Sequence, residues 1–278
     1  MNIQYKESEI YYHDYIKIIK FNDSSYKLIQ FKNPVRKSGF EKDESFEYDF
    51  ETLDSNKTTE NQNEEYLRQS LSRTKKTIKE YALCNEFEYF STLTFDRTKI
   101  NACELETIKK NIGQWLNNYK KRVNKNLKYL LIPELHKDKK HFHLHGLISG
   151  IEDIKEFRKS SKGVMRYNWI AWEDKYGFNS LEKVKNTAKV SNYITKYITK
   201  ELVTEYHKQR YLVSKGLKKP ETIMAMENYT SFIPCDFENE YVKTLNIDSY
   251  DKLQQILIYI SNTKNSWKED NYAIESSY

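Results

Sequence analysis

The chain has 278 residues, of which 38% are hydrophobic, and a mean hydropathy of −0.86. It is polar but long enough to bury a core, and its 7 glycines and 4 prolines are too few for a low-complexity chain. No apolar run is long enough to span a bilayer, and Met1 begins no signal-peptide pattern. The three cysteines, Cys84, Cys103 and Cys235, lie far apart and form no CxxC pair. These features argue against a membrane-spanning or disulfide-framework protein and predict a cytoplasmic one.

The net charge of +6 hides an uneven distribution along the chain. Residues 66–220 carry 33 Lys and Arg against 16 Asp and Glu, whereas residues 1–65 carry 9 against 14 and residues 221–278 carry 4 against 10. A basic body between acidic flanks indicates a polyanionic partner for that body, although a solvated lysine-rich surface has the same composition. We therefore predict three parts: N-terminal strands with an acidic linker (1–65), a central domain (66–220) and a C-terminal extension (221–278).

The predicted elements follow the hydrophobic periodicity. Strands are expected at Ile10–Phe21 and Tyr26–Phe31, and the acidic residues 41–65 indicate a linker. The central domain is predicted to contain helix Tyr66–Ala82, strand Phe87–Phe95, helix Cys103–Val123, strands Leu127–Leu135 and Phe142–Ile148, a short helix Ile151–Lys159, extended segments Val164–Ala171 and Gly177–Val184, and helix Ala188–Leu202. Beyond it we expect a strand or loop at Met224–Phe232, helix Asp248–Ile260 and a frayed end. This order favours an α+β fold, an antiparallel sheet with helices on one side.

Four of the six histidines lie between Pro133 and Gly150. On a strand, His143 and His145 point the same way, because side chains alternate between the two faces. If the flanking strands form a hairpin, Glu134 can reach the same face and add a carboxylate. Imidazole and carboxylate together suit Mn²⁺, Mg²⁺ or Zn²⁺. A His-rich polar sheet face is the alternative, and His141 is the alternative third ligand.

A doubled Tyr-x-x-Lys follows, made of Tyr193 with Lys196 and of Tyr197 with Lys200. On a helix, positions four apart lie about 40° from each other, so the two tyrosines share a face. A nearby lysine stabilises a phenolate and can bind a phosphate. Two tyrosines at helical spacing are also ordinary core residues. The aromatic residues Tyr167, Trp169 and Trp172 could stack on single strands, but sheet packing is the favoured interpretation for them.

The pair His143-Leu144-His145 followed by Tyr193-x-x-Lys196 resembles the HUH endonucleases, in which U is a hydrophobic residue. The His pair precedes the tyrosines, which is similar to rolling-circle replication initiators (Rep proteins) of plasmids and phages, whereas relaxases have the reverse order. A third family motif matches Phe90-Ser91-Thr92-Leu93-Thr94-Phe95-Asp96, and Tyr211–Leu217 also resembles phage-type Rep proteins. The resemblance covers about Arg68 to Pro220.

The resemblance implies an RRM-like antiparallel sheet that carries the His pair on a central strand. It also implies a Mg²⁺ or Mn²⁺ ion held by His143, His145 and Glu134. Tyr193 or Tyr197 would attack single-stranded DNA at a replication origin and form a 5′-phosphotyrosine link, with Lys196 or Lys200 steadying the phenolate or phosphate. A host helicase and polymerase would be further partners. The alternatives are a non-catalytic RRM-like single-stranded nucleic-acid binder and an HUH transposase.

Overall fold

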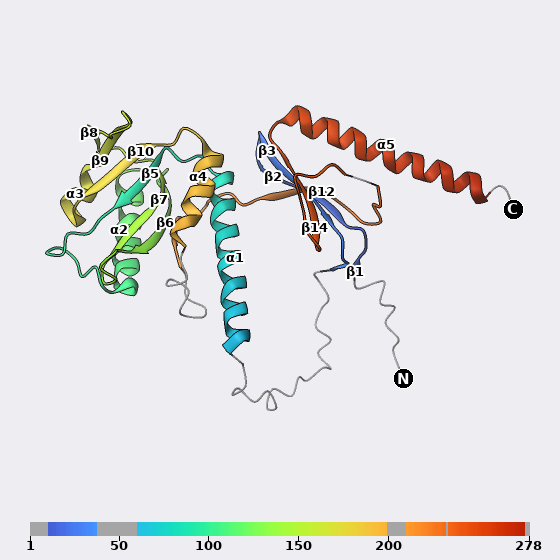
Figure 1. Cartoon of the computed structure of the whole chain (residues 1–278). Helices are drawn as coiled ribbons and strands as arrows, with labels where there is room; N and C mark the ends of the chain where they lie inside the picture. The colour runs from blue at the N-terminus through green and yellow to red at the C-terminus, as the bar shows by residue number, and fades with distance from the viewer. Residues whose placement is uncertain (1–10, 38–59, 199–209, 232, 276–278) are drawn as a thin grey trace. The chain divides into compact units, whose positions relative to one another are not determined.

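A computed structural model describes residues 11–37, 60–198, 210–231 and 233–275, with side chains described for all of these except residues 60–66 and 264–275. The chain divides into two compact units (Figure 1). Ser55–Lys219 form the unit that we call the central unit, and Met1–Asp54 with Pro220–Tyr278 form the unit that we call the flanking unit. Within the described residues, every helix is too short or too polar to cross a membrane.

The described residues of the central unit contain one seven-stranded sheet with strand order β11-β6-β7-β5-β10-β9-β8. All of its neighbouring pairs are antiparallel. The predicted α+β class, with a central antiparallel sheet and flanking helices, is confirmed. In chain order the elements are α1 (Glu60–Cys84), β5 (Tyr89–Leu93), α2 (Leu105–Arg122), β6 (Lys128–Leu135), β7 (Phe142–Ser149), β8 (Ile154–Lys159), β9 (Met165–Trp169), α3 (Ile170–Tyr176), β10 (Asn179–Lys183), α4 (Thr187–Ile194), the 3₁₀ turn η3 (Thr195–Tyr197) and β11 (Leu212–Val213).

Strand β7 lies inside the sheet, between β6 and β5. The β6–β7 hairpin pairs Glu134 with His143 and Ile132 with His145, and β5 pairs Thr92 with His145 from the other side. Gly146 allows this close approach, because a Cβ at that position would lie 2.1 Å from the carbonyl oxygen of Leu130. The hairpin register therefore sets which side chains of three adjacent strands meet around the histidines.

One face of the sheet packs on α2 through an aromatic and aliphatic core. Leu144 of β7 joins this core together with Ile108, Ile112 and Leu116 of α2. Trp169 and Trp172 are fully buried in the same cluster. The interpretation that they pack against the sheet is therefore correct, and they cannot stack on DNA.

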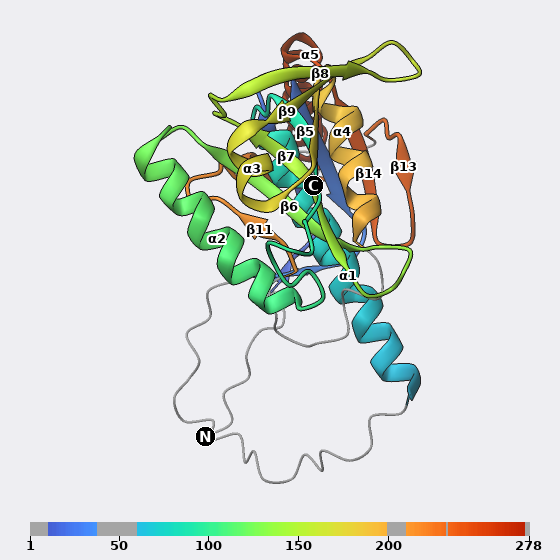
Figure 2. The same cartoon turned by 90° about the vertical axis from the view of Figure 1, so that its left-hand side faces the viewer.

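The other face of the sheet packs on α1 and α4. Leu130 of β6 and Leu147 of β7 contact the cluster formed with Ile78 of α1 and Ile194 of α4. Figure 2 shows α2 on one side of the sheet and α1 with α4 on the other. Helices therefore flank both faces rather than the single face expected from the sequence, because this sheet has apolar residues on both sides.

The predicted short helix Ile151–Lys159 is wrong. Residues Ile154–Lys159 form β8, which pairs with β9 at the edge of the sheet. Its charged residues favour a helix by propensity, yet charged side chains are also typical of an edge strand. The ring centroids of Phe157, on β8, and Phe178 are 5.9 Å apart, and this contact between distant residues cannot be predicted from local sequence.

The predicted helix Ala188–Leu202 is shorter than expected. Helix α4 ends at Ile194, η3 follows, and Ile198 already has an extended backbone. Residues 199–202 lie outside the described residues.

The flanking unit joins segments from both ends of the chain in a sheet of order β12-β2-β3-β14-β13. The sheet packs on α5 through a core that includes Ile18, Leu28 and Leu253. Strand β2 covers part of the strand predicted at Ile10–Phe21, while α5 extends through residues that were expected to fray. The elements are β1 (Tyr11–Tyr12), β2 (Ile16–Asn22), β3 (Ser25–Phe31), β4 (Val35–Arg36), β12 (Glu221–Met226), β13 (Phe237–Glu238), β14 (Val242–Ile247) and α5 (Tyr250–Glu275).

Candidate active site

Two imidazoles of β7 project from the sheet face that packs on α1 and α4. Nδ1 of His143 lies 3.3 Å from Oγ1 of Thr94, and Nδ1 of His145 lies 3.2 Å from Oγ1 of Thr92. Each hydroxyl comes from β5 or the residue just after it and fixes one ring nitrogen. The hydroxyls therefore orient both rings so that Nε2 is the nitrogen available for a further group.

Glu134 supplies the carboxylate on this face. It lies on β6 directly opposite His143, and its Oε2 is 2.7 Å from Nε2 of His145, the diagonal neighbour. Burial raises the pKa of the Glu134 carboxyl. The hairpin thus brings together the three residues predicted as metal ligands, with Glu134 in direct contact with one of them.

Both imidazoles are held in their neutral form. Burial, assisted by the charge of His136, lowers the pKa of His143. Burial, assisted by the charge of His143, lowers the pKa of His145 to about 4. At neutral pH both rings are consequently uncharged, and uncharged imidazole is the form that binds metal ions.

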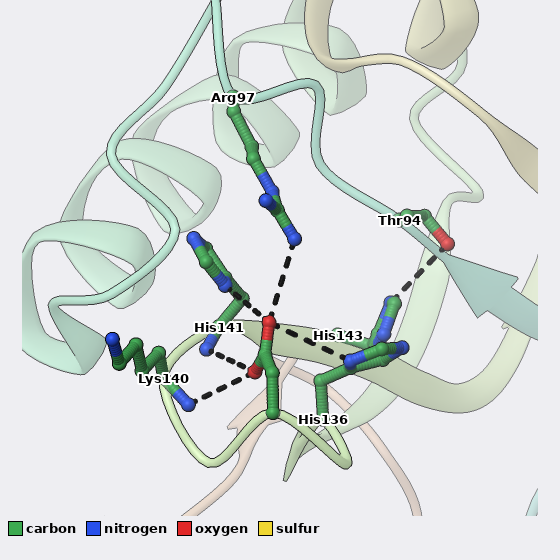
Figure 3. Close-up of polar contacts among 7 residues, drawn as sticks. Thr94, Arg97, His136, Lys140, His141 and His143 are labelled. Atoms are coloured by element: carbon green, nitrogen blue, oxygen red, sulfur yellow. Dashed lines mark hydrogen bonds and ion pairs between the residues drawn. The ribbon is translucent and has the colours of Figure 1, made fainter.

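The turn between β6 and β7 holds the other two histidines of this segment. Oδ2 of Asp138 lies 2.6 Å from Nδ1 of His141, 3.7 Å from Nδ1 of His136 and 3.4 Å from Nη2 of Arg97 (Figure 3). Hydrogen bonds from the Lys140 backbone and the His141 side chain hold the pKa of Asp138 well below its usual range. His141 is therefore engaged by a carboxylate of its own turn.

Helix α4 positions the first tyrosine. Its N-cap is Asn186, whose side-chain oxygen accepts a hydrogen bond of 2.8 Å from the backbone N–H of Lys189. Val190 and Ile194 then face the core at helical spacing. Tyr193 is 45% exposed, so part of its side chain is accessible to a macromolecular substrate.

Tyr197, on η3, packs directly on His145. Its ring stacks on His145 with centroids 4.1 Å apart and planes at 10°, and its hydroxyl donates to that of Tyr193 at 3.0 Å. The Phe90 ring lies between 5.5 and 6.4 Å from the Tyr193, Tyr197 and His145 rings. Burial and the hydrogen bond to Tyr193 raise the pKa of Tyr197. One aromatic cluster thus joins both tyrosines to the histidines.

Of the two predicted lysines, Lys196 is described. Its Nζ lies 5.2 Å from the centre of the Tyr193 ring, over the ring face. This position places a positive charge beside the more exposed tyrosine. Lys200 lies outside the described residues.

Residues 88–202 match a family model that is described as replication-associated protein ORF2. The matched segment contains the His pair, Glu134 and both Tyr-x-x-Lys motifs, and it covers less than half of the chain. It supports a role in DNA replication for the central unit. No curated protein and no solved structure gives a significant match to the chain.

The donor set within the segment that matches the family model fits a divalent cation by its chemistry. It offers two neutral imidazoles and one carboxylate from adjacent strands, with the second nitrogen of each ring held by a threonine. Among the described residues, however, no three His, Cys, Asp or Glu side chains converge closely enough to form a ready metal site. Glu134 would have to turn away from His145 for an ion to enter.

Sequence reasoning missed the roles of three residues in the matched strand β5 and at its end. Phe90, Thr92 and Thr94 were noted only as parts of a motif, yet Phe90 contacts both tyrosines and the threonines bind the two histidines. The alternation of β5 was the available signal, because Phe90, Thr92 and Thr94 share one face. Strand order was the missing information, since β5 pairs with β7 only in the folded sheet.

Proposed function

We propose that the central unit cuts single-stranded DNA at a replication origin by tyrosine attack, as in rolling-circle replication initiators of the HUH class. The observation that carries this proposal is the stacking of Tyr197 on His145, with its hydroxyl 3.0 Å from that of Tyr193. In this proposal the two hydroxyls are the nucleophiles, and they lie beside the residues proposed to bind the metal ion. The family match of residues 88–202 supports the proposal independently.

In the proposed reaction the phenol oxygen of one tyrosine attacks a backbone phosphorus atom. The new bond is a 5′-phosphotyrosyl ester, the phosphorus–O3′ bond breaks, and the phenol proton is passed on so that the leaving group departs as a free 3′-OH. That hydroxyl can prime synthesis. Because the ester is retained on the protein, a later strand transfer can reseal DNA without another energy source.

Each site residue has a distinct part in this proposal. His143, His145 and Glu134 would hold Mg²⁺ or Mn²⁺, which neutralises phosphate charge when bound. Thr92 and Thr94 keep the imidazoles oriented, and Lys196 places positive charge beside Tyr193. The proximity of both hydroxyls allows one tyrosine to hold a DNA end while the other attacks.

The proposed partners are single-stranded origin DNA and the helicase and polymerase that extend the 3′-OH, in the cytoplasm of the host. Glu134 is the proposed third ligand, because it contacts His145 whereas His141 is bonded to Asp138.

The test of the proposed function is covalent capture of DNA. The full chain is incubated with a random-sequence pool of single-stranded oligonucleotides in Mn²⁺, and adducts are separated on a denaturing gel. We expect a labelled protein band that requires the metal and disappears with a chelator. A non-catalytic binder would shift the oligonucleotides on a native gel and give no covalent band, which would contradict the proposal.

Binding of single-stranded DNA should weaken steeply with salt. Residues 66–220 carry 33 Lys and Arg against 16 Asp and Glu, and phosphate contacts release counterions. The logarithm of the affinity should fall linearly with that of salt concentration, with a slope of about −0.7 per phosphate contact. Fluorescence anisotropy of a labelled oligonucleotide measures this slope, and salt-independent binding would show that the basic residues do not contact the backbone.

A further inference from the structure

A pocket of about 320 Å³ opens beside the two tyrosines. Its floor comes from β5, β9 and β10, and α4 and η3 supply one wall. The volume is at the lower end of the range for small-ligand sites, which suits one small planar group. The lining residues are Phe90, Thr92, Arg166, Ser180, Glu182, Lys183, Val184, Val190, Tyr193 and Tyr197.

Two rows of paired residues connect this pocket to the histidines. Arg166, Glu182 and Phe90 lie directly opposite one another on β9, β10 and β5. In the next row, Ser180 pairs with Thr92, and Thr92 pairs with His145. Since neighbouring strands are about 4.8 Å apart, the pocket lining extends from one strand away from His145, on β5, to three strands away, at Arg166 on β9, on the same face of the sheet.

The polar groups of the pocket include the guanidinium of Arg166, which makes fewer hydrogen bonds than it has donors. Nη1 of Arg166 lies 3.5 Å from Oγ of Ser180, while its buried Nε has no hydrogen-bond partner among the described residues. A buried donor without a partner is costly, so the site gains if a ligand offers an acceptor. Glu182, opposite Arg166, adds a group that accepts hydrogen bonds when ionised.

This combination fits a nucleobase better than a phosphate. A phosphate offers acceptors alone and would be repelled by Glu182, whereas the Watson–Crick edge of every unpaired base carries both donors and acceptors, matching Glu182 and Arg166. Phe90 and Tyr193 add aromatic surface, on which bases stack. We propose that this pocket holds one unstacked base of the bound DNA strand, next to the phosphate under attack, and that Arg166 and Glu182 read its edge.

This proposal rests on the proposed function and gives the site a sequence preference. The test sequences the oligonucleotides that the full chain captures covalently from the random-sequence pool. For the unmodified chain we expect one base to be enriched at a fixed position next to the cut, by about 5- to 150-fold, the discrimination of one good base contact. Arg166→Gln and Glu182→Gln should each flatten or change the preference at that position and leave the other positions unaltered.

Arg122→Gln is the matched control, because Arg122 is an exposed arginine in the last turn of α2, the helix that packs on the opposite face of the sheet. It should keep the preference of the unmodified chain. If both pocket variants enrich the same base as the unmodified chain, or if Arg166→Gln lowers capture equally for all sequences, the base pocket is wrong, and the second outcome indicates a phosphate contact. Capture of no DNA by the unmodified chain would instead remove the proposed function itself, and thermal unfolding shows that each variant is folded.

Discussion

Replacing His145 with alanine is expected to abolish covalent DNA capture while the chain still folds and binds single-stranded DNA. The imidazole is one of three proposed ligands, and its loss leaves an ion weakly held and misoriented. We expect a loss beyond the 10- to 100-fold that removal of a ligand's supporting contact typically causes. His143→Ala should behave in the same way. Adduct yield in Mn²⁺, anisotropy and thermal unfolding measure the three properties separately.

His145 also packs on Tyr197, so the alanine variant alone does not separate ligation from packing. His145→Phe keeps an aromatic ring against Tyr197 and removes both nitrogens, and it should be as inactive as His145→Ala. Thr92→Val removes only the hydroxyl that binds Nδ1 of His145, and a loss of about 10- to 100-fold is expected. Capture at the unmodified rate by either His145→Phe or His143→Ala would refute the assigned metal site.

The third ligand is tested by a pair of variants. Glu134→Ala should lose metal-dependent capture, because Glu134 faces His145, whereas His141→Ala should keep it, because His141 bonds Asp138 in the hairpin turn. Metal binding measured by calorimetry gives the same comparison without catalysis. The reverse result would identify His141 as the ligand.

The parts of the site that depend on local pattern could be predicted from the sequence. Alternation placed His143 and His145 on one face, and the short polar turn before them predicted the hairpin that brings Glu134 opposite His143. The helical spacing of Tyr193 and Tyr197 likewise predicted their adjacency, although the second tyrosine lies on a 3₁₀ turn.

What could not be predicted depends on pairings between distant segments. Thr92 meets His145 because β5 lies beside β7, and Arg166 meets Glu182 because β9 lies beside β10, neither of which any local period encodes. The flanking unit shows the same limit, since β2 pairs with β12 from the other end of the chain. Such non-local pairings determine which residues surround a site, whereas local patterns indicate only which residues are candidates for it.

The tyrosine pair allows the sharpest test of the proposed chemistry. Tyr193→Phe and Tyr197→Phe each remove one hydroxyl and keep the ring, including the stacking of residue 197 on His145. Because the two hydroxyls are 3.0 Å apart, either can approach one phosphate by a small movement, so each single variant should retain part of the cleavage. The double variant should form no adduct.

Tyr167→Phe is the control for loss of a phenol, because Tyr167 packs against Tyr89 on the opposite face of the sheet and should be dispensable. Peptide mapping of trapped adducts then distinguishes the possible mechanisms. DNA on both Tyr193 and Tyr197 supports alternation between two nucleophiles. DNA on Tyr193 alone, under every condition, would reduce Tyr197 to a residue that packs against His145 and hydrogen-bonds the nucleophile, a role consistent with its burial and raised pKa. DNA on neither residue, with an adduct still formed, would require a different nucleophile and would end the tyrosine mechanism.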